Sequence, residues 1–180
     1  MQQLSDEQLM LNYREGDNDA FAALYQRHKG PLYRYLLHGS SNKATAEELF
    51  QDIWANLINA KERYQAEAGF KTYLFRLAHN RLVDYYRRNR LKLVGEDEQE
   101  EHHSSALPPE QSLSDQDCVE RLKHEIGSLP TDQRDAFVLK EESGLTLEQI
   151  GDLSGVGRET IKSRLRYAMK RLRQALEDCL

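Results

Sequence analysis

Residues 145–176 read LTLEQIGDLSGVGRETIKSRLRYAMKRLRQAL, a pattern that predicts two short helices joined by a tight turn. Thr146 and Gln149 have the spacing of a capping box and open the first helix. Gly155 supplies the backbone freedom that a tight turn requires. A second helix follows, because apolar residues recur every three or four positions, at Ile161, Leu165, Ala168, Leu172 and Leu176.

The second of these helices is strongly basic. Between residues 158 and 173 it carries seven Lys or Arg side chains and one acidic side chain. Two helices, a glycine-containing turn and a basic second helix are typical of a helix-turn-helix that reads the major groove of DNA. We expect DNA contacts from Arg158, Glu159, Lys162, Ser163, Arg164 and Arg166. Arg164 is expected at a phosphate or in solvent rather than at a base edge.

The charge of the chain is unevenly distributed. Taken alone, the net charge of −5 argues against a nucleic-acid partner. Residues 1–93, however, hold 14 basic and 11 acidic side chains, and residues 94–117 hold 8 acidic side chains and no Lys or Arg. A phosphate backbone responds to charge within a Debye length of about 8 Å, so the local sign matters more than the total. The uneven distribution of charge is therefore compatible with DNA binding, although the total charge is negative.

Two further helices are predicted before the helix-turn-helix, one through Val119, Leu122 and Ile126 and one capped by Thr131. Residues 94–116 are acidic, contain Pro108-Pro109 and offer little for a core, so they predict a disordered linker. The fold class is therefore all-α, with two small helical domains joined by an acidic flexible linker. The domain bounds are an N-terminal helical bundle over 1–93, the linker over 94–116, and a four-helix domain over 117–180.

Within the N-terminal bundle, helices are predicted to start at Ser5, near Asp17 or Asp19, and at about residue 44. Gly30-Pro31 is expected to break or kink the second of them. Residues 61–69 lack periodicity and predict a loop. A last helix covers about 70–93.

Two of these helices have polar faces that can be interpreted in two ways. On residues 44–60 the polar side chains include Glu48, Gln51 and Asp52, and this face is either solvated or a docking surface for a partner. On residues 70–93 arginines alternate with aromatic side chains. Such a face suits unstacked bases and phosphates, but an aromatic-rich core helix with a cationic outer face has the same composition.

Several classes of function and site are not indicated. No apolar run approaches the length of a membrane span, and the N-terminus lacks a signal-peptide layout, so we expect a cytoplasmic protein. Cys118 and Cys179 lie far apart without a metal-binding spacing and are predicted to be free thiols. His102-His103 is expected to be solvated. Without a phosphate loop or nucleophile motif, we expect no enzyme, no catalytic residues, no cofactor, no metal and no small-molecule substrate.

The chain resembles, nearly end to end, the extracytoplasmic-function (ECF) subfamily of bacterial RNA polymerase sigma factors. AEELFQDIW at 46–54 resembles the family's polymerase-docking helix, and FKTYLFRLAHNRLVDYYRR at 70–88 resembles its helix for promoter melting and −10 recognition. Residues 129–173 resemble its −35-binding domain. The sequence departs from the family pattern in three places. Tyr73 replaces a usual Trp, Gly157 replaces a side-chain N-cap, and Gly151 replaces a usual Ala.

The resemblance implies specific partners. Glu48, Gln51 and Asp52 would bind the clamp coiled coil of the largest subunit of core RNA polymerase. The single-stranded −10 element would be held by residues of the 61–69 loop and the following helix, namely Tyr64, Phe75, Arg76, His79, Asn80 and Arg87. Promoter DNA and a cognate anti-sigma factor are the other expected partners, and the regulon would concern stress or the cell envelope.

A stand-alone helix-turn-helix regulator is the main alternative. Such a protein also needs a basic recognition helix, but it has no use for a second basic-aromatic helix or a docking face. Regulators of this kind usually bind as dimers, and the sequence shows no dimer interface. Tight binding of duplex promoter by the isolated protein would favour this alternative.

Overall fold

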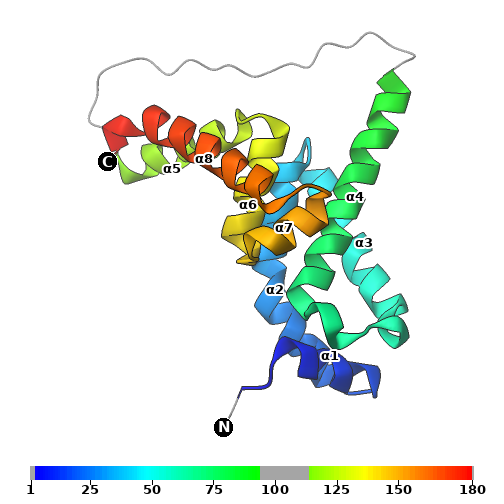
Figure 1. The fold of residues 1–180 in the computed structure, drawn as a ribbon. Helices are drawn as coiled ribbons and strands as arrows, with labels where there is room; N and C mark the ends of the chain where they lie inside the picture. Colours follow the sequence, from blue (N-terminus) through cyan, green and yellow to red (C-terminus); the bar gives the residue numbers. More distant parts are fainter. Residues whose placement is uncertain (1–2, 94–113, 180) are drawn as a thin grey trace.

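The computed structural model describes residues 3–93 and 114–179, which form helices and connecting turns (Figure 1). The N-terminal part contains α1 (Asp6–Arg14), α2 (Asn18–Gly39), α3 (Lys43–Asn59), the 3-10 turns η1 (Lys61–Arg63) and η2 (Ala66–Ala68), and α4 (Phe70–Leu93). The C-terminal part contains α5 (Asp115–Gly127), α6 (Thr131–Ser143), α7 (Leu147–Ser154), α8 (Arg158–Ala175) and the 3-10 turn η3 (Glu177–Cys179). The predicted all-α class is confirmed, and none of these helices is long and apolar enough to cross a membrane.

The long helix α2 is the centre of the N-terminal bundle, and α1, α3 and α4 pack against it. Its N-cap is Asp17, whose side chain accepts from the backbone N–H groups of Asp19 and Ala20, as the sequence predicted. Apolar side chains that recur along α2, including Leu24, Leu32 and Leu36, are fully buried. Burial of this face stabilises the bundle by roughly 1.5–3 kcal/mol per large side chain.

Pro31 lies inside α2, which runs without interruption from Asn18 to Gly39. Of the two predicted outcomes, a break or a kink at Gly30-Pro31, the break is therefore wrong. An interior proline costs about 3 kcal/mol, because it removes one backbone hydrogen bond and crowds the preceding turn. Buried side chains on both sides of it, including His28 and Tyr35, offset that cost by packing into one core.

Helix α4 begins at Phe70, whose backbone N–H donates to the carboxylate of Glu7 on α1 across 2.9 Å. The same hydrogen bond lowers the pKa of Glu7. An acidic group at the N-terminus of a helix is stabilising, because it accepts from a backbone N–H that has no partner within the helix. This contact fixes where α4 starts, and with it the rotation of its exposed face.

The C-terminal domain differs from the prediction at two helix starts. Helix α5 begins at Asp115, capped by Ser114 in a capping box with Asp117, so the predicted linker extends two residues too far. The remainder of that linker, 94–113, lies outside the described residues, as does His102-His103. Helix α6 is preceded by Pro130 as its N-cap, and no side chain caps it. Thr131 is therefore its first helical residue and not its cap.

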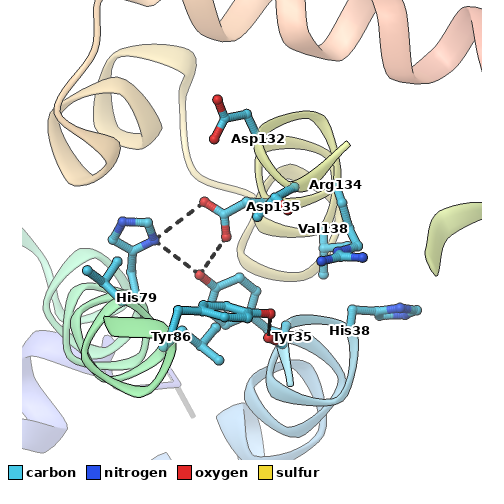
Figure 2. Close-up of a pocket in the computed structure, with 12 residues that line it drawn as sticks. Tyr35, His38, His79, Tyr86, Asp132, Arg134, Asp135 and Val138 are labelled. Carbon is cyan, nitrogen blue, oxygen red and sulfur yellow. Dashed lines mark hydrogen bonds and ion pairs between the residues drawn. The ribbon is translucent and has the colours of Figure 1, made fainter. Parts of the chain in front are cut away.

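The two domains contact each other directly. Helix α6 lies against α2, and α7 lies against α4. Figure 2 shows the polar side chains that meet between α2, α4 and α6, with Asp135 of α6 between Tyr35 and His79. The fold therefore brings the helix-turn-helix close to α4, the helix on which arginines alternate with aromatic side chains.

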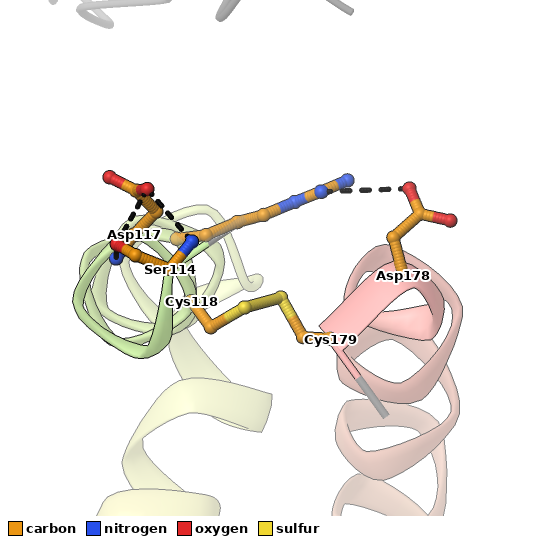
Figure 3. The surroundings of a disulfide bond; sticks show 6 residues. Ser114, Asp117, Cys118, Asp178 and Cys179 are labelled. Carbon is orange, nitrogen blue, oxygen red and sulfur yellow. Dashed lines mark hydrogen bonds and ion pairs between the residues drawn. A yellow bond between two sulfur atoms is a disulfide. The ribbon is translucent and has the colours of Figure 1, made fainter. Parts of the chain in front are cut away.

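Cys118 and Cys179 form a disulfide bond that joins α5 to η3 (Figure 3). Their Cα atoms are 5.9 Å apart, although 61 positions separate them in the sequence. The prediction of two free thiols is wrong, because spacing in the sequence does not show that α5 packs along the C-terminal end of α8. An ion pair between Arg121 and Asp178, 3.8 Å apart, lies beside the disulfide.

Candidate nucleic-acid interface

The helix-turn-helix consists of α7, the turn at 155–157, and α8. Thr146 and Gln149 form both bonds of a capping box at the start of α7, at 3.2 and 2.9 Å. Gly155 ends α7 in the left-handed conformation, with φ of +70°, which glycine adopts without steric cost. The predicted capping box at Thr146 and Gln149 and the predicted turn at Gly155 are therefore both confirmed.

Gly151 allows the backbone to fold back closely after α7. A Cβ atom at this position would lie 2.7 Å from the carbonyl oxygen of Val156. That separation is too short for a carbon–oxygen contact, so an alanine would require the turn to shift. The absence of a side chain at Gly151 thus fits the close packing of this turn.

The exposed basic face of α8 gathers five of the six predicted DNA-binding residues. At about 100° per residue, Arg158, Glu159, Lys162, Ser163 and Arg166 lie within an arc of about 140°. All are exposed except the half-buried Ser163. The opposite face of α8 is buried through Ile161, Ala168 and Leu172.

Arg164 lies away from this arc. Its Nη2 atom is 3.2 Å from the Asp132 carboxylate on α6, and the side chain is half-buried. The structure therefore does not bring Arg164 together with the other five residues, and its observed contact joins α8 to α6.

A second exposed basic face lies on α4. Arg76, Asn80 and Arg87 are exposed and fall within an arc of about 60° together with the exposed Val83. A weak ion pair links Arg87 to Asp84 at 4.0 Å. The spacing places two guanidinium groups along one side of the helix, with an amide between them, which suits a nucleic-acid strand.

Tyr64 and Phe75 are buried and do not belong to this face. Phe75 is 1% exposed and packs against the ring of Tyr35, while Tyr64 is 2% exposed and packs against Phe70 and Tyr73. Burial raises the pKa of Tyr64 to about 12. The structure therefore does not bring Tyr64 and Phe75 together with the other −10 candidates, because the core covers both rings.

His79 is half-buried and faces the C-terminal domain. Its Nδ1 atom lies 3.4 Å from the Asp135 carboxylate and 3.3 Å from the Tyr35 hydroxyl (Figure 2). The Tyr35 hydroxyl also donates to Asp135 across 2.9 Å. Burial, together with the negative charge of Asp135, raises the pKa of Tyr35 well above its usual value. The side chain of His79 therefore takes part in a contact between the two domains.

Sequence reasoning missed this contact between the domains. Tyr35 and Asp135 are 100 positions apart. The Nε atom of Arg34 donates to both carboxylate oxygens of Glu142 over 108 positions, at 2.9 and 3.0 Å. No periodicity or local motif links residues so distant in the chain. Side chains of α2, α4 and α6 line a partly open pocket of ≈ 140 Å³ at this contact.

The polar face of α3 presents Glu48, Gln51 and Asp52 within an arc of about 100°. Glu48 and Gln51 are exposed, and the half-buried Asp52 lies 4.0 Å from Arg81 of α4. The three side chains form one surface, as the spacing predicted. In the described part of the chain, no group of three or more His, Cys, Asp or Glu side chains is arranged to hold a metal ion.

Comparison with known proteins identifies both domains. Residues 24–92 match the family Sigma-70 region 2, and residues 126–174 match Sigma-70, region 4. The ECF RNA polymerase sigma factor SigK of Mycobacterium sp. (strain KMS) is 31% identical over 173 residues, covering 93% of this chain and 89% of the relative. The RNA polymerase sigma factor CarQ of Myxococcus xanthus is 29% identical over 170 residues, covering 94% of this chain and 96% of the relative.

Two solved structures share the fold. The sigma factor RpoE in complex with the anti-sigma factor NepR from Bartonella quintana superposes with a TM-score of 0.73 at 24% identity, over 87% of this chain and 96% of that chain. CnrH in complex with the cytosolic domain of CnrY superposes with a TM-score of 0.67 at 20% identity, over 96% of this chain and 97% of that chain.

Proposed function

Since the chain belongs to the ECF subfamily of RNA polymerase sigma factors, we propose that it binds core RNA polymerase, recognises the −35 and −10 promoter elements, and opens the DNA for initiation. The observation that carries this proposal is the presence of three separate surfaces in one chain. These are a basic helix-turn-helix face on α8, a second basic face on α4, and an acidic face on α3. A sigma factor uses all three, and the chain itself needs no catalytic residues.

In the proposed complex, α8 lies in the major groove of the −35 element. Residues at the N-terminal end of a recognition helix meet base edges, which assigns readout to Arg158, Glu159 and Lys162, with Ser163 and Arg166 beside them. Arginine can bond guanine through two N–H groups, and a glutamate can accept from cytosine. Each good bidentate pair contributes about 1–3 kcal/mol of discrimination between bases.

The α4 face would hold the opened −10 strand. Arg76 and Arg87 would follow the phosphates, while Asn80 would bond a base edge. His79 would join them once its contact with Asp135 is released. Separating and unstacking bases costs a few kcal/mol, which contacts of this kind offset in the open state.

The acidic α3 face, formed by Glu48, Gln51 and Asp52, would dock on the clamp coiled coil of the largest polymerase subunit. In this scheme residues 1–93 act as the region 2 domain, 94–114 as the linker, and 115–180 as the region 4 domain, with the linker shortened to where α5 begins. An anti-sigma factor is a further proposed partner, because the solved neighbour RpoE is bound to the anti-sigma factor NepR. The regulon would be one of stress or envelope response.

Promoter binding with and without polymerase tests this function. The isolated protein should bind a duplex promoter weakly, and binding should become tight and specific when core polymerase is added. A stand-alone regulator would instead bind the duplex tightly by itself and gain nothing from polymerase.

A further inference from the structure

Helix α1 contacts both ends of the 61–69 loop, the segment that leads into α4. At the start of the loop, the Nζ atom of Lys61 lies over the ring of Tyr13, 4.8 Å from the ring centroid. At the end of the loop, the Glu7 carboxylate accepts from the backbone N–H of Phe70 across 2.9 Å. Helix α1 accordingly packs against both η1 and α4 (Figure 1). One helix therefore fixes the two points between which the loop runs.

The middle of the loop is anchored by Tyr64. Its ring is 2% exposed and packs against Phe70 and Tyr73 of α4. Its backbone carbonyl accepts from the Nη1 atom of Arg14 on α1 across 3.4 Å. The residues of the loop on either side of Tyr64 are exposed. The buried ring and the α1 contact therefore hold the loop against the bundle, while the neighbouring side chains stay in solvent.

The two hydrogen bonds to the loop come from one face of α1. Glu7 and Arg14 are seven positions apart, so they share a face and lie about 10 Å apart along the helix axis. The loop itself contains two 3-10 turns of three residues each, neither with a side-chain cap. Such short turns have poor hydrogen-bond geometry. The shape of the loop therefore depends on contacts from outside it, and α1 lies outside the residues 24–92 that match Sigma-70 region 2.

We propose that Glu7 and Arg14 are positioning residues for promoter opening, because they fix the shape of the 61–69 loop that would meet the unpaired −10 strand. This role rests on the proposed function, in which the loop and the α4 face hold the same strand. The Glu7 bond sets where α4 begins, so it also places the loop relative to Arg76 and Asn80. A loop that is ordered before binding loses less conformational freedom when the strand binds. Neither Glu7 nor Arg14 has to touch DNA to strengthen binding.

Substitutions in the full-length protein provide the test. Glu7→Ala removes the acceptor at the start of α4, and Arg14→Ala removes the donor to Tyr64. Glu7→Gln is the conservative variant, since its amide oxygen can still accept from the Phe70 N–H. Asn42→Ala is the matched control, because it removes the N-cap of α3, about 25 Å from the loop along that helix.

Two measurements separate the order of the loop from its use. Hydrogen exchange of the amides of residues 61–70 reports how well the loop is ordered. The affinity of each holoenzyme is then measured for a single-stranded −10 oligonucleotide, whose sequence is taken from a promoter that the wild-type holoenzyme opens. Binding of the −35 duplex by the same holoenzymes is the internal reference, and thermal unfolding reports the loss of stability in each variant.

We expect Glu7→Ala and Arg14→Ala to exchange about tenfold faster in the loop. Both should bind the strand about tenfold more weakly, because the apparent dissociation constant rises as the competent fraction falls. Their affinity for the −35 duplex should not change, and Glu7→Gln should behave as the wild type. Asn42→Ala should lose as much thermal stability as Glu7→Ala and still bind the strand as the wild type does.

Three outcomes contradict this role. Unchanged exchange in Glu7→Ala and Arg14→Ala, or faster exchange without weaker strand binding, would overturn it. Equal weakening by Asn42→Ala would also overturn it, since the effect would then follow stability alone. If the wild-type holoenzyme opens no promoter, the proposed function fails and the positioning role fails with it, while exchange still shows whether α1 orders the loop.

Discussion

Arg158, the first residue of α8, lies 2.7 Å from the carboxylate of Glu148 on α7, measured from its Nε atom. A second carboxylate, that of Glu159, lies 2.7 Å from its Nη1 atom. The two ion pairs hold the guanidinium across the turn at the N-terminal end of the recognition helix. Both pairs are largely exposed, and exposed pairs contribute only about 0–1 kcal/mol, so Arg158 can exchange them for a base at little cost.

Replacing Arg158 with alanine should weaken binding at one base pair of the −35 element. The expected loss is about 1–3 kcal/mol for the preferred base. Discrimination among the four bases at that position should also disappear. Affinities of the holoenzyme for promoters substituted at each −35 position measure this effect. Lys170→Ala is the control, since Lys170 lies about 18 Å further along α8 and should affect all sequences equally. If Arg158→Ala weakens every promoter to the same extent, Arg158 contacts phosphate and not a base.

The Arg76→Ala/Asn80→Ala variant should lose strand opening while retaining −35 binding. These two side chains are exposed on one side of α4 and are proposed to hold the unpaired strand. Permanganate reactivity of thymines in the −10 region reports opening directly. Lys71→Ala removes a charge from the opposite side of the same helix and should leave the reactivity unchanged. Full opening by the double variant would exclude both residues from this role.

Reversing the charge of the α3 face should prevent assembly with polymerase. A partner complementary to this acidic face is basic, and placing like charges against each other costs several kcal/mol. We therefore expect Glu48→Lys/Asp52→Lys to bind core polymerase about 100-fold more weakly, with an unchanged circular dichroism spectrum. Glu15→Lys/Glu177→Lys makes the same change in net charge at exposed positions away from α3. Equal affinity of both double variants would refute the assignment of the docking surface.

Reduction of the Cys118–Cys179 disulfide should destabilise the C-terminal domain. Opening a loop closed over 61 positions removes about 2–4 kcal/mol of stabilisation. For a domain of this size, that loss lowers Tm by at least about 8 °C. Thermal unfolding with and without reductant measures the shift, and the Cys118→Ser/Cys179→Ser variant should melt at the lower temperature under both conditions. If reductant does not change the melting of the wild type, the disulfide does not contribute to stability.

Gly151→Ala should lower stability, because the added methyl group meets the carbonyl oxygen of Val156 at 2.7 Å. Overpacking of this kind typically costs about 1–3 kcal/mol. Gly127→Ala is the matched control at the end of α5, where a methyl group would meet nothing within 4 Å. This control should be neutral or stabilising by up to about 1 kcal/mol. Urea unfolding distinguishes the two variants, and equal stability would mean that the turn relaxes freely.

Patterns that depend on neighbouring residues predicted much of this structure. The capping box of α7, the turn at Gly155 and the shared face of Glu48, Gln51 and Asp52 all follow from spacings within a few positions. The resemblance to a known family, based on motifs in three segments, agrees with the regions that were later matched. Local chemistry and helical periodicity were sufficient for these features.

Features that depend on packing between distant segments were missed. Phe75 could not be assigned to the core from α4 alone, since a helix with aromatic residues on several faces does not show which ring is covered. Tyr64 lies in the segment before α4, which has no periodicity to indicate burial. A break at Pro31, one of the two predicted outcomes, was wrong because local propensity ignores the burial on either side of it. The disulfide joins residues 61 positions apart, and the Tyr35–Asp135 and Arg34–Glu142 contacts join residues 100 and 108 positions apart, so no local pattern encodes them.

Transcription with purified components tests the central claim most directly. Core RNA polymerase, genomic DNA and this chain should yield RNAs whose 5′ ends map to a small set of sites sharing one −35 and one −10 sequence. The same polymerase without the chain should not start at those sites. If the complete mixture produces no start sites beyond those of core polymerase alone, the chain does not act as a sigma factor.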